Sequence, residues 1–249
     1  MSSNNDAAAL EGPRTVSILI AGFVGFLGGQ VVATGLDALA VRLTNYPGGF
    51  NALAHAATPP WWANVLGLAG LWVGFAAAIY YAYAHGNLRS LPHQWRLRAS
   101  DVAYVALGVG CQLLVDLAYL PFHLKELNKP VTHLFGAAHG LTFVVLTLMT
   151  LVLAPVMEEW FFRGVLFRAM SERHARAGSR GVVVLAVVVS ALLFALAHGE
   201  PLQFAGLAFL GVVLALLVHR TQRLVPSVIT HISFNGVAIV TLIAQRTGH

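Results

Sequence analysis

The residues of this chain that could do chemistry form three short groups inside otherwise apolar sequence. Glu158 and Glu159 are adjacent, and Arg163 follows within the same apolar run. Two later runs each carry a pair of side chains four residues apart, Phe194 with His198 and His231 with Asn235. An ionisable group at the centre of a membrane helix costs about 2.5–3.5 kcal/mol on insertion scales, so such groups indicate function. Carboxylates and imidazoles transfer protons or bind metal ions, and the sequence raises both possibilities.

The spacing within each group predicts which side chains share a helix face. Glu159 and Arg163 are four residues apart, so they are expected to pair on one face. Glu158 is rotated from Glu159 by about 100° and therefore needs a partner from another helix. The other two groups each present one face of a helix to a bundle interior. We therefore expect a carboxylate, two imidazoles and a carboxamide to converge from three helices.

The composition indicates that these helices cross a membrane. Hydrophobic residues make up 57% of the 249 residues and charged residues 10%, against about 25% charged in a soluble domain. Mean hydropathy is +0.73. A bilayer-spanning helix needs about 20 mostly apolar residues, and seven runs qualify or nearly do, near residues 15–43, 61–84, 101–121, 140–170, 181–198, 201–219 and 225–245.

The expected fold class is all-α, a polytopic membrane helix bundle with about seven transmembrane helices, because lipid-exposed backbone must satisfy its hydrogen bonds within helices or closed barrels. No long linker divides the chain. We therefore treat residues 1–139 as N-terminal transmembrane helices of the same single bundle as residues 140–249, which hold the three groups.

Basic residues predict the orientation in the membrane. The first, third and fifth loops hold only Arg42, Lys125 and Lys129, whereas the second, fourth and sixth loops hold Arg89, Arg96, Arg98, Arg168, Arg173, Arg176, Arg180, Arg220 and Arg223. Basic loops prefer the cytoplasm, so the N-terminus is expected inside and the C-terminus outside. The net charge of +5 is thereby attributed to topology, and no nucleic acid is expected as a partner. Arginine far outnumbers lysine, as in GC-rich bacterial genomes, which favours a bacterial plasma membrane.

The first apolar run is expected to remain as a helix. It is too long for the apolar core of a signal peptide, although Val31, Val32 and Ala33 loosely fit a cleavage site. Small residues follow each other at four-residue spacing along it, at Ala21, Gly25 and Gly29. Such a face lets another helix approach closely.

The three groups, written EExxxR, FxxxH and HxxxN and occurring in this order, resemble the CAAX-protease and bacteriocin-processing (CPBP, or Abi) family of intramembrane proteases, which includes the eukaryotic Ras-converting endopeptidase. The resemblance covers roughly residues 140–240, and the earlier helices match only as membrane spans. It implies hydrolysis of a peptide bond in a membrane-associated peptide or protein substrate. Carried over by position, it implies that Glu158 activates water, His198 holds that water, His231 and Asn235 donate to the oxyanion, and three residues support the site, namely Glu159, Arg163 and Phe194.

Three alternatives remain open at this point. One glutamate and two histidines also make a zinc-binding set with an open water position, although HExxH is absent and asparagine is a poor zinc ligand. We expect no cofactor, with zinc as the alternative. The same fold could also serve a non-catalytic immunity or scaffold protein. A transporter with proton-relaying acids is the third alternative, but matching Gly/Pro-broken helices are not seen.

The predicted topology creates one geometric difficulty. His198 ends the fifth helix near the outer face, whereas Glu158 and His231 lie toward the cytoplasmic side. Convergence would require the turn at residues 199–201 to enter the membrane, or strong helix tilt. Asp116, an acid late in the third helix, is expected to have a polar partner, and Asp101 is expected to cap a helix N-terminus after Ser100.

Overall fold

The computed structural model describes residues 3–86, 88, 94–124, 126–127, 129–175 and 180–247, without the side chains of residues 3–13 and 172–175. Four of the basic residues from which the orientation was predicted lie outside this part, namely Arg89, Lys125, Arg176 and the side chain of Arg173. All regular structure within it is helical. The elements are α1 (Ser3–Thr44), α2 (Gly49–Ala54), α3 (Trp61–Ala84), the 3-10 turn η1 (Ala99–Val102), α4 (Ala103–Tyr119), the 3-10 turn η2 (Leu120–Phe122), α5 (Lys129–Phe135), α6 (Gly140–Leu148), the π-helical segment η3 (Met149–Leu153), α7 (Ala154–Glu158), the π-helical segment η4 (Glu159–Phe167), α8 (Arg168–Ala175), α9 (Arg180–Ala197), α10 (Phe204–Thr221) and α11 (Val225–Thr247).

Seven stretches of the described residues are helical, long and apolar enough to cross a membrane, which confirms the expected all-α multi-pass fold. They are 14–44, 61–84, 99–122, 140–171, 180–197, 204–221 and 225–247. The fourth stretch runs without a break through α6, η3, α7, η4 and the start of α8. Two π-helical segments interrupt its α-helical hydrogen bonding, whereas the sequence had predicted only a membrane-spanning run near residues 140–170.

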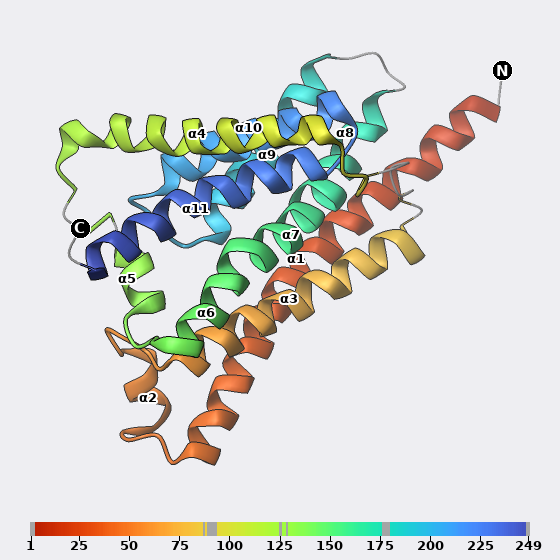
Figure 1. The fold of residues 1–249 in the computed structure, drawn as a ribbon. Coiled ribbons are helices and arrows are strands. Elements are labelled where there is room, and N and C mark those ends of the chain that lie inside the picture. The colour runs from red at the N-terminus through yellow and green to blue at the C-terminus, as the bar shows by residue number, and fades with distance from the viewer. Residues whose placement is uncertain are drawn as a thin grey trace.

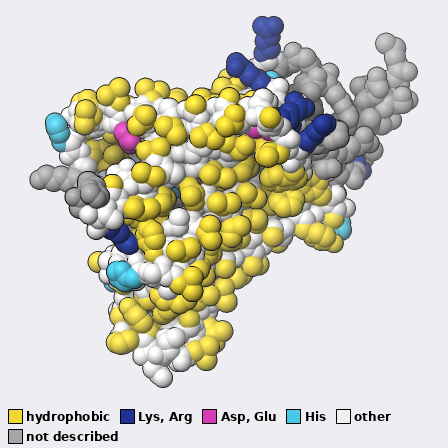
Figure 2. Space-filling model, viewed as in Figure 1, with side chains coloured by type: hydrophobic (Ala, Val, Ile, Leu, Met, Phe, Trp, Pro, Cys, Tyr) yellow, Lys and Arg dark blue, Asp and Glu magenta, His cyan; other side chains and the backbone are white. Residues whose placement is uncertain are grey.

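The helices form two inclined groups. Figure 1 shows α1, α3 and the α6–α7 helix running diagonally, with α4, α9, α10 and α11 lying across them. The most extensive pairings are α1 with α3, α4 with α11, and α9 with α10. On the face shown in Figure 2, hydrophobic side chains dominate and basic side chains gather at the end that bears α8. Apolar side chains on the outside are expected where lipid replaces water as the solvent.

Glycines bring α1 and α3 into contact, as the small-residue spacing predicted. A Cβ added to Gly25 would lie 2.6 Å from the carbonyl oxygen of Gly74, and one added to Gly74 would overlap the carbonyl oxygen of Gly25. No larger residue fits at either position without separating the helices. The two backbones therefore pack directly, in the manner of small-residue contacts between membrane helices.

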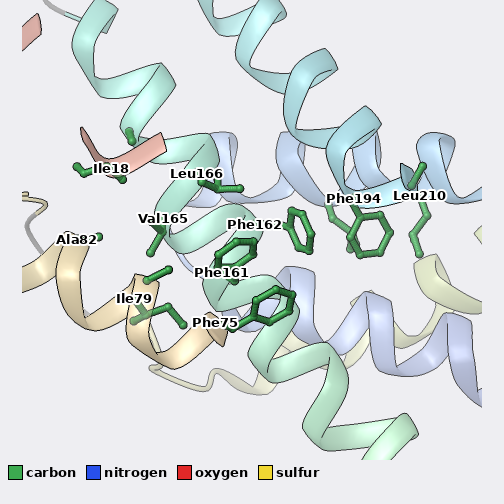
Figure 3. Close-up of a cluster of buried hydrophobic side chains, with 14 of the residues drawn as sticks. Ile18, Phe75, Ile79, Ala82, Phe161, Phe162, Val165, Leu166, Phe194 and Leu210 are labelled. Atoms are coloured by element: carbon green, nitrogen blue, oxygen red, sulfur yellow. The ribbon is translucent and has the colours of Figure 1, made fainter. Parts of the chain in front are cut away.

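The central core is aromatic and adjoins the chemically active groups. The rings of Phe75 and Phe161 stack with centroids 4.1 Å apart, and those of Phe162 and Phe194 meet edge to face at 5.4 Å. Figure 3 shows these rings between α3, the η4 segment and α9, with Leu210 of α10 beside Phe194. Offset-stacked and edge-to-face pairs are the favoured aromatic arrangements and add about 0.5–1.5 kcal/mol each beyond burial. This core fixes η4 against the helix that carries Phe194.

A buried ion pair joins the start of α4 to the connection between α10 and α11. Arg223 donates to both carboxylate oxygens of Asp101, and Asp101 also accepts from the backbone N–H of Arg98 at 2.8 Å. The prediction of Asp101 as an N-cap is wrong. Arg98 is the N-cap of the η1 turn, and Asp101 lies within that turn, where its carboxylate accepts from the backbone N–H of Arg98. Arg223 was expected as an exposed loop charge, but it is 5% exposed because its guanidinium is used by this pair.

Candidate active site

Glu158 meets both histidines at one carboxylate oxygen. Its Oε2 lies 3.9 Å from Nε2 of His198 and 3.8 Å from Nε2 of His231. These distances exceed a direct hydrogen bond, and polar groups at such a separation are commonly bridged by water. The Glu158 side chain is 15% exposed, whereas that of the adjacent Glu159 is fully buried. The two adjacent glutamates therefore have different environments, as their rotation about the helix axis predicted.

The end of α9 orients His198. Gly199 adopts φ +66, a conformation that suits glycine, and this turn places His198 just beyond the last residue of the helix. The Nδ1–H of His198 donates to the carbonyl oxygen of Phe194 at 2.8 Å, which satisfies one of the unpaired carbonyls of the last turn. With the proton on Nδ1, the neutral ring keeps a lone pair on Nε2, the atom that faces Glu158.

Glu159 orients His231 in the same way from the opposite side. The Nδ1–H of His231, which is 2% exposed, donates to Oε1 of Glu159 at 3.1 Å. The same oxygen accepts from Nη1 of Arg163 at 2.7 Å, so the predicted pairing of Glu159 with Arg163 is present. Both histidines thus use Nδ1 to bind a fixed acceptor and present Nε2 to Glu158.

Arg163 is fully buried and held from three sides. Beyond Glu159, it donates through Nη2 to the carbonyl oxygen of Gly211 on α10 at 3.2 Å. Its guanidinium carbon lies 4.3 Å from the centroid of the Phe194 ring, within the range of a cation–π contact. Phe194 also meets the rings of His198 and His231 edge to face, at 4.6 and 5.4 Å. Phe194 therefore packs between the arginine and both imidazoles, which is a supporting position.

Asn235 is anchored by a backbone carbonyl that Pro155 leaves without a helical donor. In the η3 segment, the N–H of Ala154 donates to the carbonyl of Met149 and not to that of Thr150. The next residue, Pro155, has no N–H. The carbonyl of Thr150 instead accepts from Nδ2 of Asn235 at 3.3 Å. The sequence analysis did not identify Thr150, although Pro155, five residues later in the chain, indicates that the Thr150 carbonyl lacks a π-helical donor.

One cavity connects these residues. It has a volume of ≈ 290 Å³, and Glu158, His198, Thr150 and Asn235 all line it. His231 is not among the residues that line this cavity, but its Nε2 lies 3.8 Å from Oε2 of Glu158. The structure thus brings the four residues of the predicted site together, three at the cavity wall and His231 beside Glu158. Asp116 of α4, which the sequence singled out without a role, lines the same cavity and accepts from Nε2 of Gln112 at 2.7 Å.

His198 reaches Glu158 in the folded bundle, with Nε2 of His198 3.9 Å from Oε2 of Glu158. α9 and α10 both contact η4, and α11 contacts η3 and α7. These helices cross the α6–α7 helix and do not run parallel to it (Figure 1).

The donors fit a shared metal ion poorly. Oε2 of Glu158 is 3.9 Å from Nε2 of His198 and 3.8 Å from Nε2 of His231, and two ligands at about 2.0–2.1 Å from a tetrahedral zinc lie closer together than this. No group of three or more His, Cys, Asp or Glu within the described ranges is arranged to hold a metal ion. The mechanism proposed below therefore uses only side chains of the protein.

Comparison with known proteins places this site within a matched region. Residues 132–237 match the family described as "Type II CAAX prenyl endopeptidase Rce1-like". The "Membrane-embedded CAAX protease MroQ" of Staphylococcus aureus (strain USA300) is 35% identical over 94 residues, which are 36% of this chain and 36% of that protein. An "Uncharacterized 24.3 kDa protein" of Escherichia coli is 29% identical over 150 residues, 59% of this chain and 62% of that protein. The chain thus spans less than two thirds of either relative. No solved structure matches it.

Proposed function

We propose that this chain, whose residues 132–237 match the Rce1-like CAAX protease family, is an intramembrane endopeptidase that hydrolyses a peptide bond of a membrane-associated peptide or protein. The observation that supports this best is the pair of Nε2 atoms, 3.8 and 3.9 Å from one carboxylate oxygen of Glu158. A glutamate in that setting, at a cavity wall, is arranged to activate water.

Glu158 acts as the general base in this proposal. A water between Glu158 and His198 donates one hydrogen to Oε2 and the other to the Nε2 lone pair, which leaves its own lone pair free to attack. Glu158 takes the proton as the water oxygen bonds to the carbonyl carbon of the substrate. The tetrahedral oxyanion then collapses, the C–N bond breaks, and the amine leaves with the proton that Glu158 held. Such positioned proton transfer contributes about 10²–10⁴-fold to rate.

Asn235 and His231 stabilise the oxyanion. The carboxamide has two N–H donors, and the Thr150 carbonyl uses one of them. For Nε2 of His231 to donate while Nδ1 binds Glu159, the ring must carry both protons. The Glu159 carboxylate at 3.1 Å compensates that positive charge. Arg163 in turn holds Glu159, so these two residues act through His231.

The decisive experiment replaces Glu158 with glutamine. The variant keeps the shape of the side chain but has no basic carboxylate, so turnover is expected to fall at least about 10²-fold with unchanged folded yield. Substrates are found by comparing terminal fragments in membranes from cells that make the parent protein or Glu158→Gln. Cleavage of those substrates is then measured with purified protein. The matched control is Glu126→Gln, which removes a surface carboxylate whose ion pair is with Lys129.

A strong chelator tests the metal-dependent alternative on the same purified protein. Activity is expected to persist, because every proposed step uses side chains of the chain itself. Loss of activity on chelation with recovery on adding zinc would assign the zinc mechanism. Cleavage by Glu158→Gln at the parent rate would refute the glutamate mechanism altogether, and the absence of any Glu158-dependent fragment would favour the scaffold alternative.

A further inference from the structure

We infer that Asp116 selects substrates that carry a positively charged side chain near the cleaved bond, by pairing with a lysine or arginine of the bound peptide. This inference rests on the proposed protease function and adds a substrate class to it. The observation behind it is that Asp116 lies on the wall of the cavity that also contains Glu158 and His198.

Asp116 stands where two cavities meet. A second cavity of ≈ 340 Å³ lies beside the first, and both are lined by Gln112, Asp116, Tyr119, Leu127, Val131 and Ala238. The second cavity extends along α11 toward Gln245, near the C-terminal end of the chain. A peptide that reaches Glu158 from that end therefore passes the Asp116 carboxylate.

We call the two adjoining cavities the passage, and hydrogen bonds hold its walls in place. The backbone N–H of Gly206 at the start of α10 donates to the hydroxyl of Tyr119 at 3.0 Å. Gln203 donates through Nε2 to the carbonyl oxygen of Leu127 at 2.7 Å. These bonds join the end of α4 and the segment after it to α10. The Asp116 carboxylate is therefore presented from a fixed wall.

The passage carries negative charge at Asp116. Asp116 is exposed, and the bond it accepts comes from the neutral amide of Gln112, which occupies Oδ1. No lysine or arginine occurs among the described residues that line either cavity. An ionised group in a membrane helix is costly unless it is paired or faces water. A cation on the substrate supplies that partner, and it discriminates against acidic peptides through like-charge repulsion.

Peptide binding without cleavage tests the inference. The purified full chain carrying Glu158→Gln, in nanodiscs of neutral phosphatidylcholine, is titrated into dansyl-labelled pentapeptides Leu-Leu-Xaa-Leu-Leu, where Xaa is lysine, glutamine or glutamate. Fluorescence anisotropy gives the affinities. The lysine peptide is expected to bind roughly three- to tenfold more tightly than the glutamine peptide, as a partly exposed charge pair allows. The glutamate peptide is expected to bind most weakly.

Two variants of Asp116 decide the matter. With Asp116→Asn the lysine and glutamine peptides should bind equally, and with Asp116→Lys the preference should invert toward glutamate. Glu126→Gln is the matched control, because Glu126 lies near the passage without lining it, and it should keep the lysine preference. Asp116→Asn alone suffices if the lysine variant fails to insert.

Equal binding of the lysine and glutamine peptides by the parent, or a lysine preference that survives in Asp116→Asn, would overturn the inference. Because no bond is cleaved in this assay, its outcome is independent of the test of Glu158. Charge selection without any protease activity would leave a cation-binding cavity in a protein of another function.

Discussion

At the scale of single residues, the adjacent glutamates divide two tasks. Glu159 is fully buried and its Oε1 binds Arg163 and His231, while Glu158 reaches the cavity. The division follows from the helix period, because consecutive residues point about 100° apart. Only Glu159 lies on the same face of the helix as Arg163, four positions later, and pairs with it. The proposed base is therefore the glutamate whose own helix offers it no basic partner.

Arg163→Ala tests the supporting role at this scale. Removing one partner of a buried ion pair costs about 3–5 kcal/mol, because the remaining charge is left uncompensated. We expect less folded protein and a lower thermal unfolding midpoint in detergent. Arg220→Ala, which removes an exposed arginine of α10, is the control and should leave the midpoint near the parent value.

The double variant Glu159→Ala/Arg163→Ala should lose less stability than the sum of the two single variants, because the residues share one interaction. An Arg163→Ala protein with the parent midpoint and reduced turnover would instead show a direct role in the reaction.

At the scale of elements, the helix with two π-helical segments is the positioning device. π-Helical bulges are rare and frequently occur at functional sites. Here the first one, together with Pro155, leaves the Thr150 carbonyl for Asn235. The second begins at Glu159 and carries Arg163. A regular α-helix would use the Thr150 carbonyl within its own backbone ladder.

Pro155→Ala is predicted to lower turnover without lowering stability. Alanine supplies an N–H that can bond to the carbonyl of Leu151 or Thr150, so it competes with Asn235 for its anchor. A misplaced catalytic group costs up to about 100-fold in rate, and we expect a loss of about 10- to 100-fold. The folded yield should hold or rise, since an interior proline costs a helix roughly 3 kcal/mol.

A double-mutant cycle with Asn235→Ala assigns the cause. Asn235→Ala alone should lose roughly 10²–10³-fold if it forms the oxyanion site, and adding Pro155→Ala should then have little further effect. Pro226→Ala is the control, because Pro226 lies in the first turn of α11, where a missing N–H costs little. Additive losses in rate would mean that Pro155 acts by another route.

At the scale of the whole molecule, the distribution of charge predicts orientation. Basic side chains gather at the α8 end on the face shown in Figure 2. Arg168 and Arg223 were counted as loop charges, but both are buried, at 4% and 5% exposure. Among the described arginines of the second, fourth and sixth loops, Arg96, Arg98, Arg180 and Arg220 are exposed and support the expectation of a cytoplasmic N-terminus.

Single cysteines test this orientation in a Cys111→Ala background. A cysteine at Thr247, at the end of α11, should react with an impermeant thiol reagent on intact cells. A cysteine at Gln222, between α10 and α11, should react only after the membrane is opened. Both positions are exposed, so access to the reagent differs only by side of the membrane. The reverse labelling pattern would invert the proposed topology.

What the sequence determined by itself was local. Runs of about 20 apolar residues specify membrane helices, because backbone polar groups must be satisfied within lipid. Residues four apart share a helix face, so the Glu159–Arg163 pair and the Phe194–His198 contact followed from spacing alone. The small-residue face of α1 predicted its close packing in the same way.

Tertiary structure alone decided how distant residues meet. The packing of α9 and α11 against the helix of Glu158 brings His198 and His231 within 3.9 Å of its carboxylate. Asp101 finds Arg223 across 122 positions, and Asn235 finds a carbonyl 85 positions away. The cavity at Asp116 likewise depends on how side chains of α3, α4, α5, η3, α7, α10 and α11 fill space. Periodicity constrains neighbours within a turn or two, whereas these contacts depend on the packing of the whole bundle, which no short stretch of sequence contains.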